Sequence, residues 1–346
     1  MLRSRMTPPR DPTCRQINTK FTSKLYTFVF LTLLAAFFGR QSYSTSLASS
    51  VREYKMEHGR RFHAYKDGAY NFPNDDKEQD RLDMVHHMQM LAKDKKLFLA
   101  PLSAPPKRIL DVGTGTGIWA IEAGDAYPNA EIIGNDLSPI QPHWVPPNVR
   151  FEVDDAESDW PTDRAGLFDL VHCRYLAGSI ADWPRLMRQA FTATRPGTGW
   201  AEFSDYEMRY YADDGSMPAD SHMARLADLL VDGCAQIGRT VSPGPQLQTW
   251  MEDAGFVDVQ TRLCKLPLGA WPKDPVLKKI GAFNFVQTYE GLEAFVLGVF
   301  TRVLGWSADE VQVFVAKCRR DMKRKDVHMM LNFHVAYGRR PEETAV

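Results

Sequence analysis

The sequence predicts an α/β fold in which a mostly parallel sheet carries helices on both faces. Between residues 108 and 203, short apolar segments typical of strands alternate with segments typical of helices. Several of the strands end in acidic residues, and a glycine-rich turn joins the first strand directly to a helix. Such alternation indicates a parallel sheet, because each parallel connection must cross over the sheet. The 346 residues suffice for one large domain with additions or for two modest domains.

The first 45 residues differ from the rest of the chain. Residues 1–40 carry seven basic side chains against one acid, and residues 25–38 form an apolar run. This run is shorter than the ~20 residues that cross a bilayer as a straight helix. We predict an extension over residues 1–45 that is a signal or anchor, an organellar presequence or a weakly ordered segment, and the three alternatives remain open. Membrane contact is expected only through residues 25–38.

Residues 46–106 are predicted to form an N-terminal helical cap. Asp75, Asp76 and Glu78 crowd a helix start, where acidic side chains interact favourably with the helix dipole. Apolar and polar residues then follow at helical spacing up to Ala92, and prolines from Pro101 onward close the segment.

The elements that follow are predicted from the period of their apolar residues. Helix starts are marked by Asp182, with proline in the first turn, and by Ser307 with Glu310 as a capping box. The predicted strands are 108–112, 130–134, 149–153, 167–172, 200–203, 256–266 and 329–337, and the predicted helices are 118–127, 182–194, 219–237, 246–254, 274–300 and one beginning at residue 308.

Composition excludes several classes of function. The formal net charge of −1 provides no global attraction to nucleic acid, so no nucleic-acid partner is expected. The five cysteines are odd in number, far apart and without a CxxC pair. This pattern argues against a disulfide framework and against a zinc site, so buried free thiols and no metal are expected.

The glycine-rich turn Asp111-Val112-Gly113-Thr114-Gly115-Thr116-Gly117 is the strongest chemical signal. Glycine is needed where a Cβ would block a ligand or forbid the backbone angles, and the helix that follows turns its free N–H groups toward the ligand. A dinucleotide site would have a third glycine at Ile118, and a phosphate-binding P-loop would have a Lys-Ser or Lys-Thr pair. Asp111 suits a ligand that is cationic at that end. A turn without a ligand, or a nicotinamide dehydrogenase, remains as an alternative.

Further polar residues stand where the next strands end. Asp136 lies about twenty residues beyond the glycines, where an acid accepts from ribose hydroxyls. Asp155 lies beside the small residue Ala156, which leaves room for a ring, and His172 ends the fourth strand. Because the carboxyl ends of parallel strands line one crevice, these residues are expected to converge.

These motifs resemble those of class I S-adenosylmethionine-dependent methyltransferases and, more narrowly, the LaeA-like methyltransferases of filamentous fungi. The resemblance covers residues 50–341 and leaves out residues 1–45. Beyond the turn it rests on segments such as Gly59–Tyr65, Tyr70–Asp75, Gly178–Trp183, Trp271–Asp274, Leu304–Ser307 and Tyr337–Pro341. One departure is Thr198, where the family often has a second glycine after proline.

The resemblance implies a Rossmann-like seven-stranded sheet with the last strand antiparallel, in a methyltransferase domain over residues 107–341 with a helical insertion at about 270–325. It implies S-adenosylmethionine as the cofactor, with Asp136 at the ribose and Asp155 with Ala156 at the adenine. The methionine part would lie against the turn. The full set of expected cofactor-binding residues is Asp111, Gly113, Thr114, Gly115, Gly117, Asp136, Leu137, Asp155 and Ala156.

The expected acceptor is a small molecule of secondary metabolism that is methylated on oxygen or nitrogen. His172 is the candidate general base by position, and a structural role is its alternative. Arg174, Tyr175, Asp205 and Tyr206 are candidates for the acceptor pocket, as are six aromatic residues of the insertion: Trp271, Phe283, Phe285, Tyr289, Phe295 and Phe300. The alternative function is a LaeA-like regulator in a nuclear complex with unspecified protein partners. A cytoplasmic location is expected for the catalytic domain.

Overall fold

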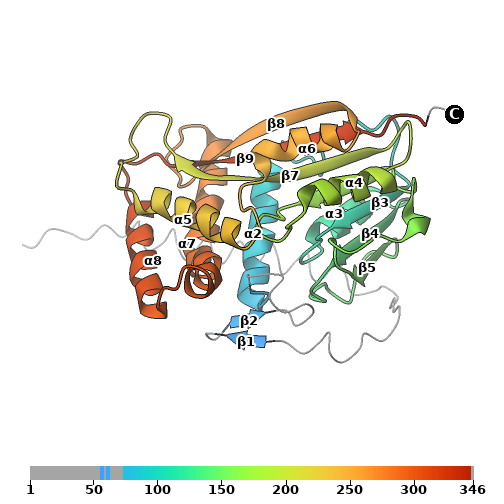
Figure 1. The fold of residues 1–346 in the computed structure, drawn as a ribbon. Coiled ribbons are helices and arrows are strands. Elements are labelled where there is room, and N and C mark those ends of the chain that lie inside the picture. Colours follow the sequence, from blue (N-terminus) through green and yellow to red (C-terminus); the bar gives the residue numbers. More distant parts are fainter. Residues whose placement is uncertain (1–54, 58–59, 63–72, 344–346) are drawn as a thin grey trace, which may run out of the picture. The chain divides into compact units, whose positions relative to one another are not determined.

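The computed structural model describes residues 55–57, 60–62 and 73–343 (Figure 1). The predicted extension over residues 1–45, with its apolar run, lies outside the described residues. Among the described helices, none combines the length and the apolar character that a bilayer crossing requires.

The predicted seven-stranded sheet is confirmed, with the strand order β5-β4-β3-β6-β7-β9-β8. Strands β5, β4, β3, β6 and β7 are parallel to one another, and β9 runs antiparallel to both β7 and β8. The last strand of the chain is therefore the reversed one, as expected. The bounds are β3 Arg108–Val112, β4 Glu131–Asp136, β5 Val149–Val153, β6 Leu170–Arg174, β7 Trp200–Tyr211, β8 Val257–Pro267 and β9 Met330–Arg339.

Helices cover both faces of this sheet because successive strand residues point to opposite sides. Ile109 on β3 packs in a core with Trp119 of α3 (Ile118–Ala126). Its neighbour Leu110 packs in another core with residues of α4 (Trp183–Ala193) and α6 (Leu247–Asp253). Both faces of β3 are thereby buried, and Ile109, Leu110 and Val112 supply its apolar side chains.

The C-terminal helices form a third packed region with β7, β8 and β9. Between β8 and β9 the chain forms α7 (Pro275–Arg302) and α8 (Ala308–Met322), and α8 begins with the predicted capping box of Ser307 and Glu310. Helices α5 (His222–Gln236), α7 and α8 lie on one side of α2, and strands β3, β4 and β5 lie on the other side (Figure 1). The described cysteines, Cys173, Cys234, Cys264 and Cys318, are buried free thiols, as predicted.

The N-terminal cap consists of α2 (Asp76–Ala92), preceded by two short paired strands, β1 (Lys55–Glu57) and β2 (Arg60–Phe62). Neither strand was predicted from the sequence, because three residues are too few to show a period. Asp75 caps α2 by accepting from the backbone N–H of Glu78.

A buried carboxylate fastens the end of the cap to the sheet. Glu202 of β7 is fully buried and accepts from the backbone N–H groups of Leu99 and Ala100, at 2.5 and 3.0 Å. Lys93, just beyond α2, is also fully buried, and its Nζ lies 3.5 Å from Glu202. Burying a charge is tolerated when it is paired and hydrogen-bonded, so this cluster fixes the position of α2.

Candidate functional site

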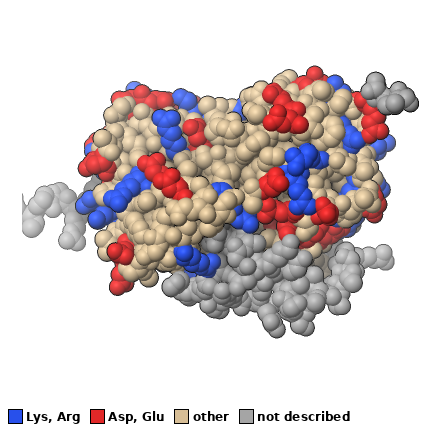
Figure 2. Space-filling model, in the orientation of Figure 1, with Lys and Arg blue, Asp and Glu red and all other residues tan. Residues whose placement is uncertain are grey.

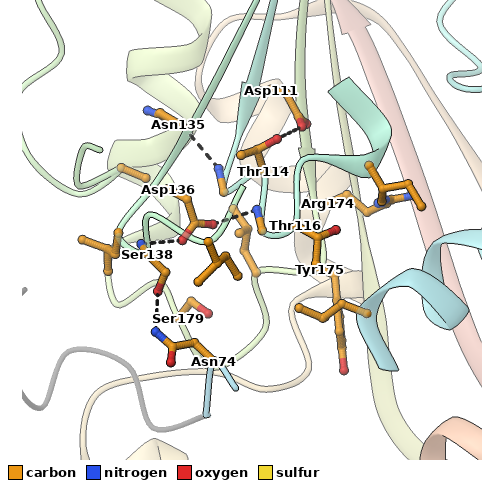
Figure 3. Close-up of a pocket in the computed structure, with 18 of the residues that line it drawn as sticks. Asn74, Asp111, Thr114, Thr116, Asn135, Asp136, Ser138, Arg174, Tyr175 and Ser179 are labelled. Carbon is orange, nitrogen blue, oxygen red and sulfur yellow. Dashed lines mark hydrogen bonds between the residues drawn. The ribbon is translucent and has the colours of Figure 1, made fainter. Parts of the chain in front are cut away.

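A cavity lies at the carboxyl ends of β3, β4, β5 and β6, and α2 forms its opposite wall (Figure 3). It has the position expected for a ligand site in an open parallel sheet. Of the ten predicted site residues, eight line it: Asp111, Gly113, Thr114, Gly115, Asp136, Leu137, Asp155 and Ala156. Gly117 and His172 do not.

The glycine turn between β3 and α3 is held in a conformation that favours glycine at three positions. Gly113, Gly115 and Gly117 have φ values of +66°, +59° and +80°. A Cβ on Gly113 would lie 2.3 Å from Leu176, and one on Gly117 would lie 2.4 Å from the ring of Phe151. Gly115 differs, because the nearest heavy atom to its Cβ is 4.0 Å away. Gly113 and Gly117 are therefore required by packing, whereas Gly115 keeps the cavity open.

Asp111 joins the turn to the neighbouring strand. Its carboxylate is buried and accepts from the hydroxyl of Thr114 at 2.5 Å, and its other oxygen lies 2.7 Å from Nδ1 of His172. The His172 ring stacks on Trp119 of α3, with 3.7 Å between the ring centroids. Burial lowers the pKa of His172, although the contact with Asp111 opposes the shift.

His172 is thus sealed inside the sheet. Its side chain is fully buried, and Nε2 is buried without a hydrogen-bond partner. A carboxylate only accepts, so Nδ1 donates to Asp111 and the free lone pair of Nε2 is enclosed. The geometry gives His172 contact with Asp111 and Trp119 and no place on the cavity wall. Its predicted role as general base stays a prediction that no contact supports.

Asp136 closes the opposite side of the turn. One of its carboxylate oxygens accepts from the backbone N–H of Gly115 at 2.8 Å, and the other accepts from the backbone N–H of Ser138 at 2.9 Å. Asn74, from the segment before α2, donates to the Ser138 hydroxyl at 3.3 Å (Figure 3). Each carboxylate oxygen has more than one lone pair, so Asp136 is able to accept from ligand hydroxyls as well.

Asp155 follows β5 at the far side of the cavity. Its carboxylate accepts from the backbone N–H of Glu157 at 2.9 Å and from the Ser158 hydroxyl at 3.3 Å. These bonds form a tight loop that holds Ala156 at the cavity wall. The predicted acids of β4 and β5 therefore do converge at one edge.

From the sequence, only His86 and His87 of α2 were candidates to cover the site, with a place on the helix surface as the alternative, and the other contributions of this helix were missed. One stripe of this helix lines the cavity: Glu78, Gln79, Leu82, Val85, His86 and Gln89. Their spacing of three and four was visible, but the same spacing marks any helix face buried in a core. Burial lowers the pKa of His86 to about 4, and its Nε2 lies 3.0 Å from Glu122 of α3. His86 is therefore neutral at physiological pH.

A second, more apolar cavity adjoins the first and shares Glu78, Tyr175 and Ser179 with it. Its walls come from α2, β7, α5 and α7, and its other lining residues are Arg81, Ala177, Tyr206, Met208, Tyr210, Leu226, Leu230, Val241, Gln287, Thr288, Phe295 and Leu331. Of the six aromatic residues predicted to wall a pocket, only Phe295 lines this cavity.

Tyr175 stands where the two cavities meet. Its φ of +60° is uncommon for a residue other than glycine, and strained backbone of this kind clusters at functional sites. Its hydroxyl accepts from the guanidinium of Arg81 at 3.3 Å, and Arg81 is itself buried in a pair with Glu78. Tyr206 lines the second cavity as predicted, whereas the Asp205 carboxylate is occupied by three backbone N–H groups. Burial raises the pKa of Asp205 to about 7.

Comparison with known proteins identifies a family. A family model described as a methyltransferase domain matches residues 84–261. Methyltransferase pytC of Aspergillus terreus is 51% identical over 298 residues, which are 86% of this chain and 91% of that protein. Secondary metabolism regulator LAE1 of Cochliobolus heterostrophus is 38% identical, over 83% of this chain and 95% of that protein. Protein-methionine methyltransferase laeA of Emericella nidulans is 31% identical, over 85% of this chain and 78% of that protein.

The packing at Gly117 predicts a stability difference between two alanine variants. Gly117→Ala and Gly215→Ala both place a Cβ at positive φ, which costs about 1–2 kcal/mol. Only Gly117→Ala also meets the Phe151 ring, whereas a Cβ on Gly215 meets nothing within 4 Å. We expect Gly117→Ala to lose about 1–3 kcal/mol more unfolding free energy, measured by denaturant titration. Equal losses in the two variants would show that the ring moves away freely.

Proposed function

The chain belongs to the S-adenosylmethionine-dependent methyltransferase family of the LaeA-like fungal proteins, and we propose that it methylates a small, largely apolar molecule of secondary metabolism. The observation that carries the proposal is the pair of adjoining cavities. One is built of acidic strand ends and a glycine turn, and the other is built mainly of apolar and aromatic side chains. A donor site beside an acceptor site is the arrangement that group transfer requires.

In this proposal the donor lies along the first cavity. We propose that Asp136, with Leu137, holds the ribose, and that Asp155 and Ala156 hold the adenine. The methionine part would lie against Asp111, Gly113, Thr114 and Gly115, while Gly117 shapes the turn from behind. The fit is supported by the open space at Gly115 and by the place of the Asp136 carboxylate on the cavity wall.

Catalysis in such a site is chiefly a matter of positioning. The bound sulfonium supplies the reactive methyl group, and the chain's residues orient the two partners and exclude water. Asp111 contributes a negative charge fixed by Thr114 and His172, on the side where the donor is cationic. We therefore propose a positioning role for His172, which holds the Asp111 carboxylate in place.

The second cavity defines the class of acceptor. Tyr210, Leu226 and Leu230 give it apolar walls, which suit a ring system or a prenyl-like or acyl-like body. The residues with polar groups that line it are Tyr175, Ser179, Tyr206, Tyr210, Gln287 and Thr288, together with the Arg81–Glu78 pair. We propose that these groups orient an acceptor that carries one or two oxygen or nitrogen functions.

A regulatory role is the second candidate, because two of the relatives are a secondary metabolism regulator and a protein-methionine methyltransferase. The family assignment replaces the nicotinamide dehydrogenase alternative.

We propose a cytoplasmic location for the catalytic domain, because the donor is made in the cytoplasm. Finding a fluorescent fusion of the protein inside an organelle would contradict this location. No nucleic-acid partner is proposed, because acidic and basic side chains are interspersed on the face drawn in Figure 2 and the net charge is −1.

Calorimetry tests the donor site directly. Gly115→Arg places a long side chain in the cavity, so we expect S-adenosylmethionine affinity to fall by roughly 100-fold or more. Gly215→Arg carries the same backbone strain away from the site and should bind like the unmodified protein. Unchanged affinity in Gly115→Arg would refute the assignment of the turn, and tight NAD binding without S-adenosylmethionine binding would refute the function.

Metabolite profiling of a deletion strain tests the role in the cell. We expect a compound lighter by one methyl group to accumulate and the methylated product to disappear. Complementation with the unmodified gene should restore the product, whereas the Gly115→Arg gene should not. Restoration by the Gly115→Arg gene, or the loss of many unrelated metabolites, would favour the regulatory role instead.

Filling the second cavity tests the acceptor site separately. Met208 lines it from β7, and Met208→Trp adds bulk there, whereas Met208→Leu conserves volume. With the accumulating compound as acceptor, we expect Met208→Trp to raise its KM by about 10-fold or more, the equivalent of 1.4 kcal/mol, and to leave donor affinity unchanged. Equal kinetics for the two variants would place the acceptor elsewhere.

A further inference from the structure

Arg174 lines the proposed donor cavity and has no role in the proposed function so far described. It is the last residue of β6, one position beyond Cys173, which pairs with Val112 of β3. It therefore lies beside the glycine turn and lines the same cavity as Asp111 and Gly113. Figure 3 shows Arg174 and Tyr175 to one side of the drawn residues, with Asn135, Asp136 and Ser138 to the other.

The guanidinium of Arg174 has no partner within the described part of the chain. It makes no hydrogen bond or ion pair there, and its Nη1 is buried without an acceptor. Burial lowers the pKa of Arg174, opposed by the more distant charges of Asp111, Glu122 and Glu202. An unpaired, desolvated cation is costly, and such a group is retained when a ligand completes its pairing.

Each nearby acid is already engaged by another group. Asp111 contacts Thr114 and His172, Asp83 accepts from Thr116, Glu122 lies beside His86, and Glu202 lies beside Lys93. These acids contribute a diffuse negative potential, but none of them forms an ion pair with Arg174. The site therefore has room for one more anionic group, at the β6 side of the turn.

The proposed donor has one anionic group, the carboxylate of its methionine part. Its adenosine end is assigned to Asp136 and Asp155, on the side of β4 and β5. The amino-acid end then extends toward β6, where a carboxylate and a guanidinium, Asp111 and Arg174, flank the turn. That pair of opposite charges complements a zwitterion, with the ammonium toward Asp111 and the carboxylate toward Arg174.

We propose that Arg174 binds the carboxylate of S-adenosylmethionine, an assignment that rests on the proposed function. A charge-assisted contact of this kind contributes about 10- to 100-fold to affinity. The assignment moves Arg174 from the acceptor pocket, where the sequence analysis placed it, to the donor site. It also makes Arg174 a residue that favours S-adenosylmethionine over analogues without the carboxylate.

Calorimetry with two probes, S-adenosylmethionine and its decarboxylated analogue, tests the assignment. The unmodified protein should bind S-adenosylmethionine at least about 10-fold more tightly than the analogue. Arg174→Met should abolish most of that preference by weakening S-adenosylmethionine alone, and Arg174→Lys should restore part of it. Arg188→Met, which removes an exposed arginine on α4, should leave both affinities unchanged.

Thermal unfolding without ligand provides an independent measurement. Because Arg174→Met removes an unpaired buried cation, we expect this variant to unfold at the same or a higher temperature than the unmodified protein. Equal weakening of both probes by Arg174→Met, or a raised acceptor KM with unchanged donor affinity, would overturn the assignment alone. Failure of the unmodified protein to bind S-adenosylmethionine would overturn the proposed function and the assignment together.

Discussion

The carboxylate of Asp111 is the point on which the rest of the site depends. Asp111 is the last residue but one of β3, and its buried carboxylate fixes the Thr114 hydroxyl in the turn and the His172 ring in β6. His172 in turn stacks on Trp119 at the start of α3. One continuous set of contacts thereby holds together β3, the glycine turn, β6 and α3. A carboxylate held in this way keeps its direction toward the cavity without reorganisation, which is what electrostatic preorganisation requires.

The cavity is completed by elements far apart in the sequence. The cap helix α2 is fastened through Lys93, Leu99 and Ala100 to the buried Glu202 of β7, and its other side faces both cavities. The apolar cavity needs α5 and α7 as well, and α7 belongs to the insertion. The strand ends and α2 therefore line the proposed donor site, while the cap and the C-terminal helices form most of the proposed acceptor site.

Much of the donor site could be predicted because its residues occupy fixed positions in a repeating pattern. Strand ends in a parallel sheet meet at one edge whatever the side chains are, so Asp111, Asp136 and Asp155 were brought together as expected. The general-base interpretation of His172 found no supporting contact. The sequence predicted that a strand ends at His172, but β6 continues to Arg174, and the register pairs His172 with Asp111, where its ring is sealed beneath the cavity. The position of a residue along a strand predicts how close it lies to the edge of the sheet. It does not predict which way the side chain points.

The sequence by itself determined the order of the helices and of the seven strands of the main sheet, the need for three glycines after β3 and the family to which the chain belongs. These properties depend on local periodicity and on backbone angles, which neighbouring residues set. Only the tertiary structure decided that Arg174 has no partner among the described residues. It also decided that Gly115 faces open space while Gly117 faces Phe151, and that Phe295 rather than Phe300 lines the second cavity. Each of these is a property of long-range packing, because partners that are distant along the chain decide whether a charge is paired or a side chain is enclosed.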